Sequence, residues 1–456
     1  MTTKPPKAAD PLENAREFAS GIAPGLWPGA SVTSIEPLRG DASTRSYARV
    51  RLSGGSGAPP TVVVMMMQDA AVAMSSEELG VFGKDGPKEL AFVNIGRFLA
   101  RLTEAVPTIH AVSPDSRLLL LEDVGDTTLW EASADRPSEM FGRALDLLAD
   151  LQARATDDGS GCYAFVQSFD EKLFAWEFEH FLEYGVVDAP PALLEESRAE
   201  LARVATRLAA LPRVFAHRDY HAWNIHVQAD KGLRLIDFQD ALLAPALYDV
   251  ASLLTDRITP ERITPGLEES LLVRFYSRQK AGRLESLDAT RSAYRLIALQ
   301  RVLKVVGRFH YLADVKGKPH YLTFLPAVCA TARRLLAASE GVAATARLFE
   351  AAGRDPSRAA AAPPAVRTAA APPVVQTAAK PPVVRTAVEP PAVRTAAKPP
   401  AARVAAKPPV AQVAAKPPVA RATTKPPAVL AAAQPPAVAE APAAKSTRRR
   451  RPAEKG

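Results

Sequence analysis

Two patterns of hydrophobic and polar positions divide the chain near residue 125. Before it, apolar runs of strand length lie at residues 45–52, 61–67 and 117–121, and a Gly-Gly-Ser-Gly turn separates the first two. Short apolar runs bounded by turn residues predict β-strands. Residues 89–102 instead repeat apolar positions at helical spacing. This part of the chain is therefore predicted to be a small sheet with one helix.

From about residue 138 onward, apolar positions recur at intervals of three and four, the spacing of one helical face. The predicted helices cover residues 141–154, 171–184, 193–211, 268–278 and 289–309. A short apolar run at 233–236 predicts a strand, which can form a hairpin with Val227 and its neighbours. This second part is therefore predicted to be mostly helical.

The last hundred residues have a different composition. Pro-Pro pairs recur every nine residues from 363 to 435, among Ala, Val, Thr, Lys and Arg, and no aromatic residue follows residue 353. Proline favours extended polyproline II, and such a segment has nothing from which to form a core. Residues 351–456 are therefore predicted to be a disordered tail, and residues 1–14 a disordered N-terminus.

The positive charge of the chain belongs to this tail. Residues 354–456 contain 18 Lys and Arg against 4 Asp and Glu, a net charge of +14, whereas the whole chain carries +8. The remainder is therefore acidic, at −6. The basic tip at 448–451 is suited to a weak anionic partner such as nucleic acid, anionic lipid or an acidic protein. The alternative is a solvated extension with weak, salt-sensitive contacts.

Cysteine content and hydropathy indicate the compartment. Cys162 and Cys329 lack the paired spacing of a disulfide framework or a cysteine-based metal site, which suits a reducing cytoplasm. We see no basic and apolar leader and no apolar run of about 18 residues, so neither export nor a membrane span is indicated. We expect a soluble, cytoplasmic protein, and the sequence gives no indication of its oligomeric state.

The motif that indicates chemistry is His217-Arg218-Asp219, with Asn224 five positions after the aspartate and Asp237 at the end of the 233–236 run. Phosphoryl transfer needs a carboxylate near the attacking hydroxyl and oxygen ligands for magnesium on the β and γ phosphates. Asp219 suits the first task, and Asn224 and Asp237 suit the second. Any one of them alone is typical of a loop or cap. Together they predict a phosphotransferase.

Several further motifs support one family. They are 40–47 (GDASTRSY), 119–126 (LLLEDVGD), 217–221 (HRDYH), 236–241 (IDFQDA), 248–254 (YDVASLL), 300–309 (QRVLKVVGRF) and 317–322 (GKPHYL). In these motifs the sequence resembles the aminoglycoside phosphotransferase-like, or choline-kinase-like, superfamily. More narrowly, it is similar to the bacterial anomeric kinases that phosphorylate N-acetylmuramate and N-acetylglucosamine in cell-wall recycling. The resemblance covers residues 20 to 345.

The resemblance implies an α+β, bilobal, protein-kinase-like fold. A small antiparallel-sheet N-lobe at 15–125 would carry the nucleotide-binding elements, and a larger helical C-lobe at 126–350 would carry the catalytic and substrate sites. ATP would lie in the cleft between them. The cofactors implied are ATP and Mg²⁺, and the substrate is a small-molecule amino sugar.

The resemblance also implies roles for individual residues. Asp219 would be the catalytic base, and Asn224 and Asp237 the magnesium ligands. The phosphate-covering residues would be Gly40, Asp41, Ala42, Ser43 and Arg45, although this stretch is also typical of an ordinary hairpin turn. The backbone of Glu122, Asp123 and Val124 would bind adenine, or simply end a strand in a turn. His217 would brace the catalytic loop, and Asp249 would accept hydrogen bonds from its backbone.

One departure concerns the third strand. Kinases place a lysine there to hold the α and β phosphates, whereas residues 62–68 read Val-Val-Val-Met-Met-Met-Gln. Either magnesium and the phosphate loop supply the charge, with Arg45, or nucleotide affinity is weak. The methionines are predicted to fill the core.

The acceptor site is predicted within the helical lobe. A neutral sugar needs amides, carboxylates and an aromatic platform, for which the candidates are Trp176, Glu177, Tyr220 and His221. The lactyl carboxylate of N-acetylmuramate would need a cation, because a buried carboxylate must be paired. Arg301 or Lys304 could supply it, and the alternative for both is a partly exposed helix surface.

Two other functions remain open at this point. An antibiotic-modifying aminoglycoside phosphotransferase would need a strongly acidic acceptor cleft, whereas Arg and Lys are interleaved with the acids of this helical lobe. A non-catalytic kinase-fold scaffold acting through its basic tail would have no chemical need for Asp219, Asn224 and Asp237 together.

Overall fold

The computed structural model describes residues 10–38, 45–67, 89–115, 117–229, 232–279 and 284–356. The predicted phosphate-covering residues Gly40, Asp41, Ala42 and Ser43 lie outside the described residues, as does the predicted tail beyond residue 356.

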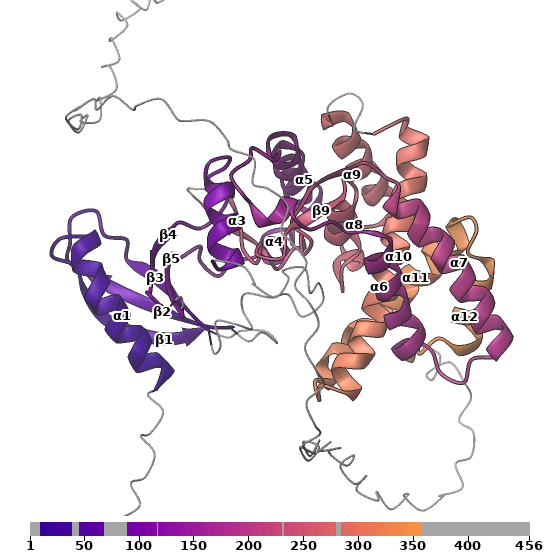
Figure 1. The fold of residues 1–456 in the computed structure, drawn as a ribbon, viewed down its shortest axis with the longest axis horizontal. Helices are drawn as coiled ribbons and strands as arrows, with labels where there is room; N and C mark the ends of the chain where they lie inside the picture. The colour runs from indigo at the N-terminus through magenta and orange to yellow at the C-terminus, as the bar shows by residue number, and fades with distance from the viewer. Residues whose placement is uncertain are drawn as a thin grey trace, which may run out of the picture. The chain divides into compact units, whose positions relative to one another are not determined.

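The N-lobe is built on a five-stranded sheet with the strand order β1-β2-β3-β5-β4. All neighbouring strands are antiparallel. The strands are β1 (Ser31–Leu38), β2 (Arg45–Ser53), β3 (Thr61–Met67), β4 (Ile109–Val112) and β5 (Leu118–Glu122). Helix α1 (Pro11–Leu26) packs on strands β1, β2 and β3, and α3 (Ala91–Ala100) lies between β3 and β4 in the chain (Figure 1).

Strand β3 is buried on both faces, which explains why it is a nearly continuous apolar run. Val62, Val64 and Met66 join the smaller core beneath α1. Met65 and Met67 point to the other face and join the main core. The alternation follows from the two-residue period of a strand. The prediction that these methionines fill the core is confirmed.

Helix α1 corrects the predicted N-terminal boundary, because residues 11–14 were assigned to a disordered segment. The side chain of Asp10 accepts a hydrogen bond from the Leu12 N–H at 3.1 Å, and Pro11 occupies the first turn. Both are strong signals for the start of a helix. Ala15, Ala19 and Ala23 then form its buried face against the sheet.

The C-lobe is mostly helical. Its helices are α4 (Leu129–Ala132), α5 (Pro137–Arg154), α6 (Glu171–Tyr184), α7 (Pro191–Ala209), α8 (Tyr248–Thr255), α9 (Pro265–Arg278), α10 (Leu287–Asp314), α11 (Leu325–Ala338) and α12 (Ala343–Ala352). Helix α10 packs against α6, α8 and α11 (Figure 1). A Cβ atom at Gly307 would lie 2.3 Å from the carbonyl oxygen of His180, so the approach of α10 to α6 requires glycine there.

Two short strand pairs lie within the helical part. Strand β6 (Arg213–Ala216) pairs with β9 (Leu242–Pro245), and β7 (Ile225–Gln228) pairs with β8 (Gly232–Leu235). The second pair is the hairpin that the sequence predicts. Together with the sheet and the helices, it confirms an α+β protein with a small antiparallel sheet and a larger helical part.

The folded part extends further than the predicted boundary at residue 350, which would cut through α12. The Arg354 N–H donates to the Gly185 carbonyl oxygen at 2.9 Å. Asp355 is 7% exposed and forms an ion pair with Arg333. These contacts attach residues up to at least 355 to the helical part.

Cys162 and Cys329 are both buried and free. Among the described residues, we find no helix that is long and apolar enough to cross a membrane.

Candidate active site

The loop between β6 and β7 presents Asp219, and helix α8 fixes its backbone. The carboxylate of Asp249, in the first turn of α8, accepts hydrogen bonds from the His217 N–H at 2.6 Å and from the Arg218 N–H at 3.0 Å. Arg218 has a φ of +75°, a conformation that L-residues seldom adopt unless their surroundings impose it. The hydrogen bonds predicted for Asp249 are therefore present, and they hold the loop in an unfavourable conformation.

His217 links this loop to the segment after β8, which carries Asp237. Its Nε2 lies 3.0 Å from the Ile236 carbonyl oxygen. Burial lowers the pKa of His217 to about 4, so the ring is neutral at physiological pH. Because a carbonyl oxygen can only accept, Nε2 carries the proton and donates it. This contact agrees with the predicted bracing role.

Asp219 is held in its ionised form. Burial alone would raise the pKa of this half-buried carboxyl, but neighbouring basic groups lower it to about 2. Those groups are Arg218, Lys304, His221 and Arg301. Asp219 is thus a carboxylate over the whole physiological range, able to accept a hydrogen bond from a substrate hydroxyl.

The β7–β8 hairpin brings the two predicted metal ligands to its open end. Ile225 is paired with Leu235, and the Ile236 N–H donates to the Asn224 carbonyl oxygen at 3.0 Å. The Asn224 Nδ2 donates to the Asp219 carbonyl oxygen at 3.0 Å, so its amide oxygen is the atom that a metal would take. Asp237 has a φ of +62° at the end of β8.

These residues fit a magnesium ion bound together with phosphates. A carboxylate and an amide oxygen are hard ligands, which Mg²⁺ prefers, and it usually takes few protein ligands. Among the described residues, no three His, Cys, Asp or Glu side chains are grouped so that they could hold a metal ion alone. Substrate phosphates and water would therefore complete the coordination.

Arg45, at the start of β2, reaches Asp237. Its Nη1 lies 3.3 Å from Asp237 Oδ1, which also accepts from Gln239 Nε2 at 2.8 Å. A guanidinium group from the sheet thus lies beside a predicted ligand of magnesium.

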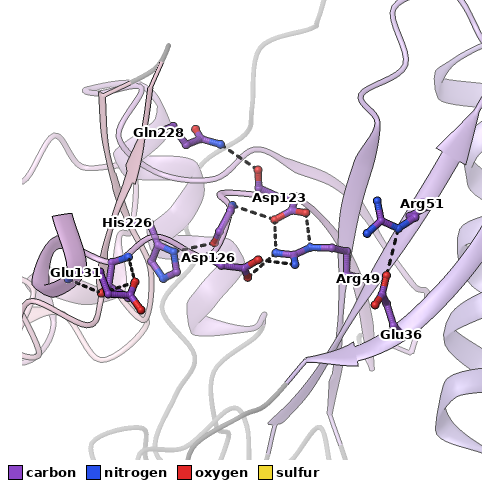
Figure 2. Close-up of polar contacts among 10 residues, drawn as sticks. Glu36, Arg49, Arg51, Asp123, Asp126, Glu131, His226 and Gln228 are labelled. Atoms are coloured by element: carbon purple, nitrogen blue, oxygen red, sulfur yellow. Dashed lines mark hydrogen bonds and ion pairs between the residues drawn. The ribbon is translucent and has the colours of Figure 1, made fainter.

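The predicted adenine-binding segment at the end of β5 is held on two sides (Figure 2). Arg49 of β2 donates to Asp123 at 2.7 and 3.1 Å, and to Asp126 at 2.8 Å through both terminal nitrogens. From β7, Gln228 Nε2 donates to the Asp123 carbonyl oxygen at 3.1 Å, and His226 contacts the Gly125 carbonyl oxygen at 2.8 Å. The segment is therefore clamped between strands of the two lobes.

These contacts limit which backbone groups adenine could use. The Glu122 N–H already donates to the Thr108 carbonyl oxygen at 2.8 Å, and the Glu122 side chain forms an ion pair with Arg234. An amide has one proton to donate, so this contact occupies the Glu122 N–H. The predicted adenine contacts of the Glu122, Asp123 and Val124 backbone stay predictions.

The predicted acceptor residues Glu177 and Lys304 form an ion pair in which the carboxylate is buried. Glu177 is 0% exposed and contacts Lys304 Nζ at 2.5 Å and Gln300 Nε2 at 2.7 Å. Arg301 is 6% exposed, and its Nη1 donates to the Arg218 carbonyl oxygen at 3.3 Å. The partly exposed helix surface considered for both cations is therefore wrong for Arg301, which is buried against the catalytic loop, whereas the Lys304 side chain is 18% exposed, as that alternative predicts.

The other acceptor candidates are placed differently. Tyr220 is 0% exposed and its hydroxyl donates to the Ala144 carbonyl oxygen at 2.7 Å, so its prediction as a substrate contact is wrong. His221 belongs to the catalytic loop and contacts Asn224 Nδ2 at 3.3 Å. Trp176 is 43% exposed and its ring stacks on His180, so it is accessible on α6.

Sequence reasoning missed several residues of this region. Arg218 lay inside the recognised motif, but its electrostatic effect on Asp219 was not inferred. The only sequence signal for Arg49 is its place in the alternating pattern of β2, and the only signal for Gln239 is its place next to Asp240. Neither signal indicates their contacts with Asp123 and Asp237. The contacts of Trp223 with Trp130 and with Arg257 join distant segments, and no local pattern indicates them.

A small antiparallel sheet, a helical lobe, a loop presenting an ionised aspartate and a hairpin carrying two hard ligands define a kinase-like phosphotransferase. The model of the phosphotransferase enzyme family matches residues 34–269, more than half of the chain. The protein belongs to this family. The predictions of a protein-kinase-like fold and of a phosphotransferase are thereby confirmed.

Known relatives carry more specific names. The chain is 31% identical over 246 residues to an N-acetylmuramate/N-acetylglucosamine kinase of Pseudomonas putida, covering 52% of this chain and 69% of the relative. It is 29% identical over 323 residues to the kinase of the same name from Caulobacter vibrioides, covering 64% and 84%. A solved choline/ethanolamine kinase family protein from Mesorhizobium loti shares 16% identity at a TM-score of 0.47, covering 74% of this chain and 99% of that protein.

Proposed function

We propose that the protein transfers the γ-phosphoryl group of ATP to the anomeric hydroxyl of N-acetylmuramate or N-acetylglucosamine, in cell-wall recycling. The observation that carries the proposal is the catalytic loop, in which Asp249 holds the backbone that presents an ionised Asp219. The relatives named N-acetylmuramate/N-acetylglucosamine kinase support the choice of acceptor.

In this reaction Asp219 accepts a hydrogen bond from the anomeric hydroxyl and orients its oxygen toward the γ-phosphorus. The new oxygen–phosphorus bond forms as the bond to the β-phosphate oxygen breaks, and ADP leaves. Because a carboxyl group with a pKa of about 2 gives up a proton readily, Asp219 passes the hydroxyl proton on to solvent or to the product phosphate.

Asn224 and Asp237 are the residues that would hold magnesium, which neutralises phosphate charge when it is bound. Arg45 lies 3.3 Å from Asp237 and is the cation best placed to do the work of the missing third-strand lysine. At this position beside a predicted magnesium ligand, the guanidinium of Arg45 would lie near the phosphates. Arg is suited to this because its fork of N–H donors matches phosphate oxygens.

The basic surroundings of Asp219 favour a neutral or anionic acceptor. Arg218, Arg301 and Lys304 all lower the pKa of Asp219, so they lie within electrostatic reach of the reacting hydroxyl. A polycationic aminoglycoside would be repelled by the same groups.

A panel assay tests the proposal. ATP consumption should occur with N-acetylmuramate or N-acetylglucosamine in the presence of magnesium, and not with kanamycin-like compounds or choline. Asp219→Asn and Asp237→Ala should each lower kcat by several orders of magnitude, as expected for groups at the reacting phosphate. Turnover of aminoglycosides without turnover of amino sugars would refute it, and failure to bind MgATP would favour the scaffold alternative.

A further inference from the structure

Trp223, one residue before Asn224 in the catalytic loop, belongs to a series of stacked aromatic and arginine side chains. Its ring stacks on Trp130, with centroids 5.4 Å apart and planes at 20°. The guanidinium carbon of Arg257 lies 5.0 Å from the centroid of Trp223 and 5.8 Å from that of Phe324. Arg257 is therefore held against rings from two segments that are about a hundred residues apart in the chain.

The guanidinium of Arg257 has few polar contacts within the protein. Its side chain is 18% exposed, and its charged partner is the adjacent Asp256, at 3.5 Å. Within the described part of the chain, its guanidinium donates no hydrogen bond, although arginine has five N–H donors. Its φ of +42° is also strained for a residue with a side chain, and such strain gathers at binding sites.

Arg262 shows what a structural arginine in the same series looks like. It lies 3.5 Å from the ring centroid of Trp130, and its Nη1 contacts the Trp130 carbonyl oxygen and the Ser133 hydroxyl. Both guanidinium groups lie on tryptophan rings. Arg262 also donates hydrogen bonds to the protein, whereas Arg257 donates none among the described residues.

Arg257 is connected to the catalytic loop through Trp223, over whose ring its guanidinium lies at 5.0 Å. Trp223 lies four residues after Asp219 in that loop. Its ring also lies 6.1 Å from that of His221, a predicted acceptor residue, at an interplanar angle of 68°.

Two other cations that the sequence offered for a carboxylate, Lys304 and Arg301, already have partners within the protein. Lys304 is paired with the buried Glu177, and Arg301 donates to the Arg218 carbonyl oxygen above the ring of Tyr248. The Lys304 side chain is as exposed as that of Arg257, at 18%, but its Nζ contacts the buried Glu177 carboxylate, so a substrate carboxylate would have to compete with that group for it. Arg257 offers the same charge without that cost.

We infer that Arg257 binds the carboxylate of the acceptor substrate, which in N-acetylmuramate is the lactyl carboxylate. The inference rests on the proposed function. The planar fork of arginine matches a carboxylate with two parallel hydrogen bonds, and the flanking rings of Trp223 and Phe324 keep water from competing for it. N-acetylglucosamine lacks the carboxylate, so Arg257 would discriminate between the two sugars.

The test compares the two sugars as substrates of Arg257→Met, which keeps the length of the side chain and removes its charge. The kcat/KM for N-acetylmuramate should fall by about 10- to 100-fold, the effect of losing hydrogen bonds between charged groups. The kcat/KM for N-acetylglucosamine should change by less than about threefold. The kcat/KM of Arg257→Lys for N-acetylmuramate should lie between those of Arg257→Met and wild type, because lysine keeps the charge but cannot donate two parallel hydrogen bonds.

Arg101→Ala is a matched control, since Arg101 also lies on an aromatic ring, that of Phe98 at 5.4 Å, but in the N-lobe. Arg101→Ala should leave kcat/KM unchanged for both sugars. An equal fall for both sugars in Arg257→Met would assign Arg257 a merely structural role and overturn the inference. No fall for either sugar would overturn it as well.

The proposed function is tested separately from the role of Arg257, by the activity of the wild-type protein with the two sugars. If wild type phosphorylates neither sugar, the function is wrong. If it phosphorylates N-acetylglucosamine alone, the function stands and the role of Arg257 is refuted. Retained turnover of N-acetylglucosamine in Arg257→Met also shows that the variant has folded.

Discussion

Asp249→Ala should separate the activity of this protein from its stability. The substitution removes the acceptor of the His217 and Arg218 N–H groups and leaves two buried donors unpaired, at about 1–3 kcal/mol each. It also removes a carboxyl whose pKa is raised to about 7 by burial, which corresponds to about 4 kcal/mol. The two effects nearly cancel, so the unfolding free energy at pH 7 should change by no more than about 2 kcal/mol.

The catalytic effect should be much larger. Without Asp249, Arg218 has no reason to keep a φ of +75°, and relaxing it releases about 1–3 kcal/mol of strain. Asp219, the next residue, then loses its position. We expect kcat with an amino sugar to fall by at least about 100-fold, equivalent to about 3 kcal/mol in the barrier. Urea unfolding and steady-state ATP turnover measure the two quantities on the same sample.

The pH dependence provides an independent check with a definite sign. The folded-state pKa of Asp249 is raised, so wild type loses stability from this group as the pH rises from about 4 to about 7. Asp249→Ala lacks this carboxyl, so its stability does not fall for this reason. The unfolding free energy of the variant relative to that of wild type should therefore be higher at pH 8 than at pH 5, by about 2–3 kcal/mol.

Glu268→Gln is the matched control, because Glu268 is another buried carboxylate with a raised pKa and accepts from the Tyr294 hydroxyl at 2.7 Å. It lies on α9, so its substitution should alter stability and leave kcat unchanged. The reasoning would be refuted if Asp249→Ala kept wild-type kcat, or if Glu268→Gln lost as much kcat as Asp249→Ala.

Two further outcomes follow from the ends of the folded part and from Arg45. Arg45→Met should raise the KM for MgATP by about tenfold with a smaller change in kcat, since one charge-assisted phosphate contact is lost. An unchanged KM would exclude Arg45 as the replacement for lysine. A chain ending at residue 356 should keep wild-type melting and turnover, whereas one ending at 350 should lose about 1–3 kcal/mol of stability with the Asp355–Arg333 ion pair and the Arg354–Gly185 hydrogen bond. Equal melting of both would contradict this role of Asp355.

Local patterns predicted the long elements well. The strand at 61–67 and the helix at 171–184 have the predicted boundaries, because one buried run and one helical period mark each of them. Strands β4, β6 and β9 are four residues long and were not predicted. A run of that length carries too few positions to show a period, and tertiary pairing decides its structure.

The chemistry was predictable where it depends on residues close in sequence. Asp219, Asn224 and Asp237 lie within one loop and one hairpin, so their spacing already brings them together. The acceptor residues depend instead on how α6, α8 and α10 pack. Nothing local indicates that Glu177 is fully buried against Lys304, or that the ring of Tyr220 turns into the core.

The place of Arg45 in the sheet explains why we propose it as the replacement for the third-strand lysine. The register pairs Arg45 of β2 with Met67 of β3, so the two residues lie side by side at the same end of the sheet. A lysine inside β3 would have to replace a residue that fills a core on one face or the other. A cation on the neighbouring strand avoids that cost, and Arg45 reaches Asp237 from there. If Arg45→Met raises the KM for MgATP as expected, an arginine on the adjacent strand replaces the third-strand lysine in this protein.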